Sequence, residues 1–171
     1  APVLTADEKL PAQPSDILFI VGSAPADGLR NYIERGGFLV TVPSDATLLK
    51  ALTGLDLNVT ADTSDEYRML AEVKTEHPLL KPFADPKLRD FTKLRFWKHR
   101  HIQGAGVSDP QQKTLETLAT FDNGHPAILS ARIGKGTLIV LASGWHPGDS
   151  QFALSTKFVP LLYGWLAAAG F

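Results

Sequence analysis

The chain has 171 residues, of which 44% are hydrophobic and 20% charged, so it is long enough to bury a core and has the composition of a globular protein. Its net charge of -1 excludes a general attraction to nucleic acid or to anionic lipid, and we expect no nucleic-acid partner. Because the chain contains no cysteine, disulfides, thiolate metal sites and cysteine nucleophiles are all excluded.

The first part of the chain has the pattern of a parallel α/β unit. Three prolines within residues 1–15 indicate a lead-in or linker, followed by a single predicted domain at 16–171. Apolar runs typical of buried strands alternate with short helical patterns at 17–21, 29–33, 38–42 and 48–52. The short connections between these elements predict parallel neighbouring strands.

The pattern changes at about residue 55, and an insertion rich in antiparallel strands is predicted from there to about 135. Residues 56–66 are polar and weakly patterned. Extended segments are expected further on, at 67–73, 93–102, 115–121 and 126–133. The last two of these segments form a predicted hairpin around an Asp-Asn-Gly-His turn.

Residues 136–169 contain a predicted strand, a polar loop and a predicted helix, and we expect the rest of the chain to pack around them. Its unbroken apolar run at 138–142 is typical of a central strand that is covered on both faces. A polar loop follows the run, and 158–166 then has the spacing of an amphipathic helix. Together these elements predict an α/β protein. The most apolar segment, 158–171, is shorter than the roughly 20 residues that a membrane span needs.

The polar loops after the strands form the first candidate site, because ligands of open α/β sheets bind beyond the carboxyl ends of the strands. We expect this crevice to be lined by Ser23, Ser44, Ser143, Trp145, His146 and Asp149. His146 and Asp149 could act as a base oriented by a carboxylate, with Ser44 or Ser23 as the nucleophile of a serine hydrolase. The residues around Ser44 lack the glycines of a nucleophile elbow, so a helix N-cap is the common alternative for this serine.

A second candidate site is a metal site built on His99 and His101, which share one face of an extended segment. With His125 or His146 they could ligate zinc, but no carboxylate is positioned by spacing to complete the set. We therefore predict no metal and no cofactor, and keep a metal-binding module as an alternative function. The locally basic stretch 93–101 would attract an anionic ligand or protect an edge strand.

Short phrases of the sequence resemble class I glutamine amidotransferase-like domains. An order of elements similar to that family is found at 16–22, 29–37 and 38–42. The residues from Trp145 to Gly148 resemble its aromatic-His-Pro-Glu signature, whose His and Glu assist a catalytic cysteine. A degenerate branch of the family occurs in bacterial membrane-anchored proteins, some of the aerotolerance type or with von Willebrand A-like domains. Phrases similar to that branch lie at 76–79, 121–127, 134–136 and 158–162.

The resemblance implies a flavodoxin-like three-layer sandwich with a mostly parallel central sheet and the antiparallel insertion. It also implies a nucleophilic cysteine near Pro43 or Ser44 and a glutamate at Gly148; both are missing, so glutamine hydrolysis is disfavoured and we lean towards a protein that is not an enzyme.

The function implied by the resemblance is that of a non-catalytic module. We expect it to bind a protein partner, other domains of a parent chain or a small ligand at the crevice. The resemblance implies an extracytoplasmic (periplasmic) domain of a larger bacterial membrane protein, with membrane contact only through flanking segments. A chain that starts at Ala1 and ends within an apolar helix would suit such an excised domain.

Overall fold

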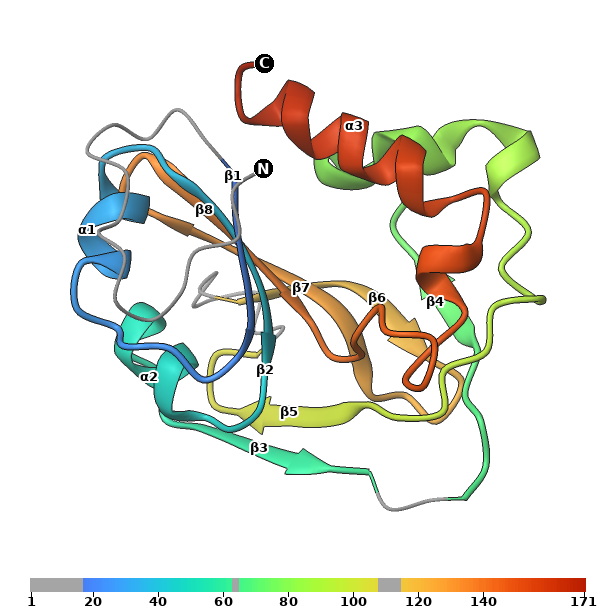
Figure 1. Ribbon diagram of the computed structural model, residues 1–171, viewed down its shortest axis with the longest axis horizontal. Helices are drawn as coiled ribbons and strands as arrows, with labels where there is room; N and C mark the ends of the chain where they lie inside the picture. Colours follow the sequence, from blue (N-terminus) through green and yellow to red (C-terminus); the bar gives the residue numbers. More distant parts are fainter. Residues whose placement is uncertain (1–16, 63–64, 108–114) are drawn as a thin grey trace.

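The computed structural model describes residues 17–62, 65–107 and 115–171, and the lead-in predicted at 1–15 lies outside these ranges. Six strands form one mixed sheet in the spatial order β1-β2-β8-β7-β6-β4 (Figure 1). Three adjacent strands run parallel to one another: β1 (Ile17–Gly22), β2 (Phe38–Pro43) and β8 (Gly136–Leu141). The sheet continues with antiparallel pairings through β7 (Pro126–Ile133), β6 (Glu116–Phe121) and β4 (Leu70–Val73).

The predicted α/β class is confirmed, but the prediction of a mostly parallel, flavodoxin-like sandwich is wrong. Three of the five strand pairings in the sheet are antiparallel, and the antiparallel strands belong to the main sheet instead of forming an inserted unit. The physical reason is the turn between β7 and β8, which has only two residues, Gly134 and Lys135. So short a connection can join only antiparallel neighbours, and the two strands pair from Ile133 and Gly136 outward.

A second, two-stranded ribbon pairs β3 (Leu57–Ala61) with β5 (Arg100–Gly104) in antiparallel orientation. The sequence predicted part of β5 but placed β3 in a weakly patterned region. Leu57 and Ile102 are both buried and anchor the ribbon to the core, whereas the other side chains of β3 are partly or fully exposed. Because only one side chain of β3 is fully buried, its alternation is too weak to predict a strand.

Helices α1 (Leu29–Glu34) and α2 (Thr47–Thr53) follow the first two strands, as the helical spacing predicts, and both contact β7. Gly54 ends α2 in the left-handed conformation with φ 74°. The end of α1 lies directly against the start of β8, since a methyl group at Gly136 would overlap the carbonyl oxygens of Ile33 and Gly37. All six residues of β8 are buried, which confirms the predicted central strand.

The C-terminal helix α3 (Phe158–Ala168) packs against a 3-10 segment, η1 (Pro78–Ala84), at the opposite end of the molecule from α1 (Figure 1). Trp165 of α3 is fully buried and donates a hydrogen bond from Nε1 to the carbonyl oxygen of Leu79, at 3.0 Å. Two further short 3-10 segments are η2 (Pro86–Leu88) and η3 (Phe152–Leu154). In the described ranges, no helix has both the length and the apolar character needed to cross a membrane.

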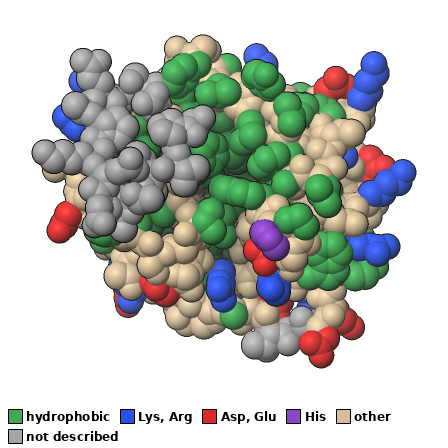
Figure 2. All heavy atoms as spheres, viewed as in Figure 1, with side chains coloured by type: hydrophobic (Ala, Val, Ile, Leu, Met, Phe, Trp, Pro, Cys, Tyr) green, Lys and Arg blue, Asp and Glu red, His purple; other side chains and the backbone are tan. Residues whose placement is uncertain are grey.

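Hydrophobic side chains gather on the face of the molecule that is viewed in Figure 2. Large exposed hydrophobic residues occur on β1 and on α3, among them Phe19, Val21, Val159 and Tyr163. An apolar surface of this kind is where a protein partner would dock. The contacts within the chain do not test the predicted protein partner, which therefore stays a prediction.

Candidate metal site beside a cavity

The β3–β5 ribbon brings Asp62 and His99 together. Ala61, the last residue of β3, pairs with Arg100, the first residue of β5. The pairing continues one residue further, because the backbone N–H of Asp62 donates to the carbonyl oxygen of His99 at 3.0 Å. Directly opposite residues of an antiparallel pair have neighbouring side chains, so this register places the Asp62 carboxylate beside the His99 imidazole.

His125 reaches the same place from the turn between β6 and β7. The turn closes through a hydrogen bond from the Phe121 N–H to the His125 carbonyl oxygen, at 2.9 Å. Gly124 has φ 82°, a conformation that L side chains rarely adopt, so the Asn-Gly sequence suits this turn. The segment before β5 is held against the end of β8, where the Arg100 N–H donates to the Ala142 carbonyl oxygen at 2.7 Å. Three separate parts of the chain therefore converge on one site.

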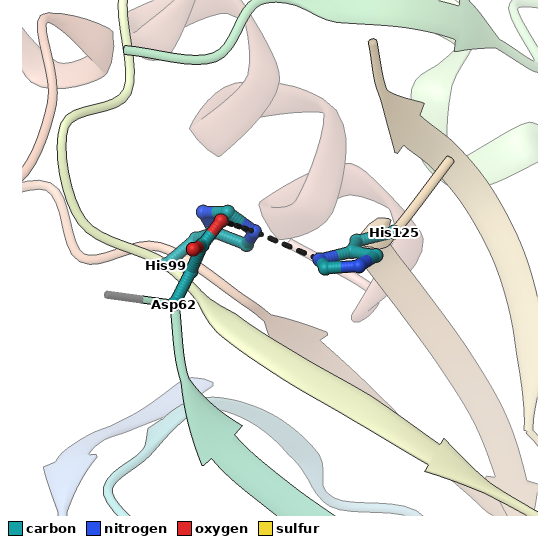
Figure 3. A group of neighbouring side chains, drawn as sticks. All are labelled: Asp62, His99 and His125. Carbon is teal, nitrogen blue, oxygen red and sulfur yellow. Dashed lines mark hydrogen bonds and ion pairs between the residues drawn. The ribbon is translucent and has the colours of Figure 1, made fainter. Parts of the chain in front are cut away.

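The three side chains present their donor atoms at spacings that suit a metal ion. His99 Nε2 lies 3.2 Å from Asp62 Oδ2 and 3.1 Å from His125 Nδ1, and all three donor atoms lie within 4.8 Å of one another (Figure 3). Ligands that lie 90–110° apart around an ion, with bonds of about 2.1 Å, are separated by about 3.0–3.4 Å. Two of the three separations therefore already fall within the range of a first coordination sphere.

The hydrogen bonds of Asn123 determine which nitrogen of His125 is unprotonated. The Asn123 Oδ1 atom accepts from the His125 backbone N–H at 3.0 Å, so its Nδ2 faces His125 Nδ1, at 3.2 Å. An amide NH₂ only donates, and Nδ1 must therefore accept. Burial lowers the pKa of both His99 and His125 below the ordinary value of 6.5, with the nearby Asp62 opposing the effect. His99 Nε2 faces this acceptor and the Asp62 carboxylate, so in the metal-free protein it carries the proton. A metal ion would displace that proton and the contact of Asn123 with His125 Nδ1, and the low pKa values keep both imidazoles in the neutral form from which this exchange starts.

A positively charged side chain lies close to the Asp62 carboxylate. The Arg68 guanidinium lies with Nε 3.8 Å from Asp62 Oδ2 and also pairs with the exposed carboxylate of Glu66, at 3.5 Å.

A cavity of about 230 Å³ adjoins this cluster at the carboxyl ends of β1, β2 and β8. Asp62 and His99 line it, together with Lys98 and Arg100 from the segment that leads into β5. The prediction of a crevice beyond the carboxyl ends of the strands therefore coincides with a cavity.

The serines of the predicted crevice have different surroundings. Ser23 and Ser44 are exposed, and their hydroxyl oxygens are 2.7 Å apart. Ser44 lines the cavity, as does Asp149. Ser143 is buried and donates to the Lys98 carbonyl oxygen at 2.6 Å, so it supports the segment that carries His99.

The loop after β8 does not place His146 at the cavity. His146 is exposed, and its Nδ1 accepts from the Gly148 N–H at 3.0 Å. The Asp149 carboxylate instead pairs with Lys98, at 3.6 Å. Trp145 packs edge-on against Phe19 of β1, with ring centroids 5.7 Å apart.

The residues of the predicted serine hydrolase are not hydrogen-bonded to one another as a catalytic set in the described part of the chain. Among the residues that the structure describes, no hydrogen bond connects the His146 side chain to Ser23, Ser44 or Asp149. Ser44 shares its hydrogen bonds with Ser23 and with Asp45, at 3.3 Å. A nucleophilic serine needs a base within hydrogen-bonding reach, and no imidazole occupies that position in the described part of the chain.

His99 and His101, which the sequence predicts to share one metal site, make different contacts in the structure. His99 joins Asp62 and His125, whereas the His101 ring stacks on the His125 ring, with centroids 3.6 Å apart and planes 3° apart. An ion bound in the ring plane of His125 lies far out of the parallel plane of His101, so His101 does not complete the set. The residue that sequence reasoning missed is Asp62, because its proximity depends on the unpredicted strand β3.

The chain matches no known protein-family model and no curated protein. Among solved structures it is similar to a cytoplasmic protein of Salmonella typhimurium, STM3548, with a TM-score of 0.64 and 15% identity, over 94% of this chain and 76% of that one. A second Salmonella typhimurium LT2 cytoplasmic protein, STM1381, matches with a TM-score of 0.59 and 14% identity, over 84% and 60% of the two chains. A β-galactosidase from Rahnella sp. R3 matches with a TM-score of 0.55 and 16% identity, over 90% of this chain and 22% of the enzyme. At these identities the similarity shows the fold alone.

These comparisons overturn the predicted family. The similar solved structures described above are neither amidotransferase-like nor aerotolerance-related proteins, and no family model supports the resemblance. The description of the chain as a degenerate, non-catalytic member of that family is wrong for the same reason. An extracytoplasmic, membrane-anchored location rested on the resemblance alone; it is contradicted as well, since two of the matched proteins are named as cytoplasmic.

Proposed function

We propose that this chain binds one divalent transition-metal ion through Asp62 Oδ2, His99 Nε2 and His125 Nδ1. The observation that supports the proposal best is the spacing of 3.1 and 3.2 Å from His99 Nε2 to donor atoms on two other parts of the chain. Two imidazoles and one carboxylate form a donor set that suits zinc and iron(II).

Three protein ligands leave at least one coordination position for water or for a small molecule. Asp62 and His99 are among the residues that line the cavity, whereas His125 is not. We therefore expect the open position to face the cavity from the side of Asp62 and His99. A metal-binding module was the second alternative among the functions predicted from the sequence. The geometry favours it over the hydrolase, whose residues do not meet.

The test is metal binding by tag-free protein, measured by isothermal titration with Zn²⁺ and, under anaerobic conditions, with Fe²⁺. We expect one ion per chain for the wild type. Asp62→Asn, His99→Gln and His125→Gln should each weaken binding by at least about tenfold. His146→Gln is the matched control, because it removes an exposed imidazole outside the cluster, and it should bind as the wild type does.

Circular dichroism of the metal-free variants shows whether each of them folds. Absence of stoichiometric binding by the folded wild type contradicts the proposal. Equal weakening by His146→Gln and His99→Gln does so too, because binding would then not reside in the cluster. Folded variants that lose stability but retain wild-type affinity would mean that the cluster is a structural hydrogen-bond network only.

A further inference from the structure

We infer, resting on the proposed metal site, that the cavity beside it binds a small oxyanion. One oxygen of this ligand, a carboxylate or a phosphate, would occupy the open position on the ion, and Arg100 and Lys98 would hold its charge. The inference gives the cavity, which Asp62 and His99 line in part, a class of ligand.

Arg100 is the main observation in favour of an anionic ligand. It lines the cavity and is partly buried, and its backbone N–H is bound to the Ala142 carbonyl oxygen. Within 17–62, 65–107 and 115–171, no hydrogen bond or ion pair engages its guanidinium. A guanidinium has five N–H donors arranged to match an oxyanion, and a partly buried one without a partner favours such a ligand.

Lys98 adds a second positive charge, and its ammonium group can move from its present partner to a ligand. Its side chain is 74% exposed and pairs with Asp149 at 3.6 Å. Exposed pairs of this kind contribute little free energy, so the ammonium group can turn to a ligand.

The charges around the cavity make anion binding depend on the metal. Without an ion, the cavity-lining Lys98 and Arg100 and the neighbouring Arg68 are balanced by the carboxylates of Asp62, Asp149 and Glu66. A bound divalent ion adds two positive charges at its wall and becomes the largest local charge. The empty site therefore has little net attraction for an anion, and the loaded site has a strong one.

The size and the other lining groups of the cavity limit the ligand to a small one. A volume of about 230 Å³ is below the roughly 300–1,000 Å³ of pockets for drug-sized molecules. The exposed Ser44 hydroxyl also lines the cavity, and it could donate to a further oxygen of the ligand by giving up its hydrogen bond to Asp45.

The experiment uses Co²⁺ as a spectroscopic substitute for the metal, in tag-free protein from which free metal has been removed. The visible ligand-field bands report first whether Co²⁺ binds at the cluster. The loaded protein is then titrated with inorganic phosphate and, separately, with acetate. We expect a saturable spectral change with at least one of these anions.

Two comparisons make the result specific. Arg100→Gln should bind Co²⁺ as the wild type does but should bind the anion at least about tenfold more weakly. Arg132→Gln is the matched control: Arg132 donates to Thr137 near the start of β8, at the other end of that strand from the cavity, and should leave anion binding unchanged. Calorimetry should show at least about tenfold weaker anion binding to metal-free protein.

The outcomes separate this inference from the metal proposal. If Co²⁺ binds and neither anion alters its spectrum, the oxyanion site is refuted while the metal site stands. Equal anion affinity with and without Co²⁺, or in wild type and Arg100→Gln, also refutes the oxyanion site. If Co²⁺ does not bind to folded wild-type protein, the metal proposal fails and the inference fails with it. A response to phosphate but not acetate assigns the ligand to the phosphate class, and the reverse assigns it to carboxylates.

Discussion

At the scale of single residues, burial of His99 makes the metal-free protein sensitive to acid. Asp62 and His125 face its imidazole, with Arg68 and His101 close by, and desolvation lowers the pKa of His99 below 6.5. The unfolded chain therefore binds more protons than the folded chain between the folded pKa and 6.5. The free energy of unfolding should fall as the pH decreases through about 6.5, and the lowered pKa of His125 acts in the same direction.

Urea denaturation of metal-free protein at about pH 7.5 and pH 5.5 measures this effect. His99→Gln should show a smaller loss of stability between the two pH values, because it removes one of the groups responsible. Equal pH dependence in wild type and in this variant would show that protonation of His99 is not coupled to folding.

Ser44 is the residue for which the geometry argues against catalysis. Its hydroxyl contacts Ser23 and Asp45, and the imidazole of His146 is bound to the Gly148 N–H. A serine without a base is not activated, so a fluorophosphonate probe should not label the protein. Labelling that disappears in both Ser44→Ala and His146→Ala would restore the hydrolase hypothesis.

At the scale of secondary structure, the stability of the sheet should depend most on β8. This strand lies between β2 and β7, where its two neighbours and the packing on both faces leave Leu141 only 2% exposed. Truncation there opens a cavity that neighbouring strands cannot fill. Leu141→Ala should therefore lower the free energy of unfolding by about 2–5 kcal/mol.

Leu154 provides the matched control for this substitution. It has the same side chain but is 72% exposed in η3, so Leu154→Ala should change stability by less than about 0.5 kcal/mol. Chemical denaturation measures both variants. A loss below about 1 kcal/mol for Leu141→Ala would mean that β8 is not the structural centre of the sheet.

At the scale of the whole molecule, a bound ion would connect parts of the chain that pack separately. Asp62 and His99 lie at the end of the β3–β5 ribbon, while His125 lies in the turn between two strands of the main sheet. Metal that binds only the native state should raise the melting temperature. At a free metal concentration 100 times Kd, the gain is about 2.7 kcal/mol, or about 5–10 °C for a chain of this size.

Differential scanning calorimetry with and without Zn²⁺ measures this stabilisation. His125→Gln should abolish most of the shift, because it removes the ligand that connects the ribbon to the sheet. A shift of the same size in His125→Gln would show that the ion acts elsewhere on the protein.

Local patterns of the sequence were enough to predict much of the fold. Apolar runs located β1, β2 and β8, and turn residues such as Gly124 located the β6–β7 hairpin. These features depend on the burial and backbone conformation of neighbouring residues, so each strand or turn can be predicted from its own segment of the sequence. The predicted family was wrong because these features are not specific to one family. Buried strands, glycine turns and short amphipathic helices recur in many α/β proteins, so short sequence matches built from them do not identify a family.

The site itself was decided by the tertiary structure. The sequence identified His99 as a candidate ligand, but its contacts with Asp62 and His125 depend on the register of β3 against β5 and on the approach of the β6–β7 turn. These contacts join residues that are far apart in the chain, and no local periodicity encodes such pairings. The sequence by itself determined which segments are buried and which residue types could bind a metal. Only the packing of the ribbon against the sheet decided which of those residues meet, because strand register is set by long-range contacts and not by the residues of one strand alone.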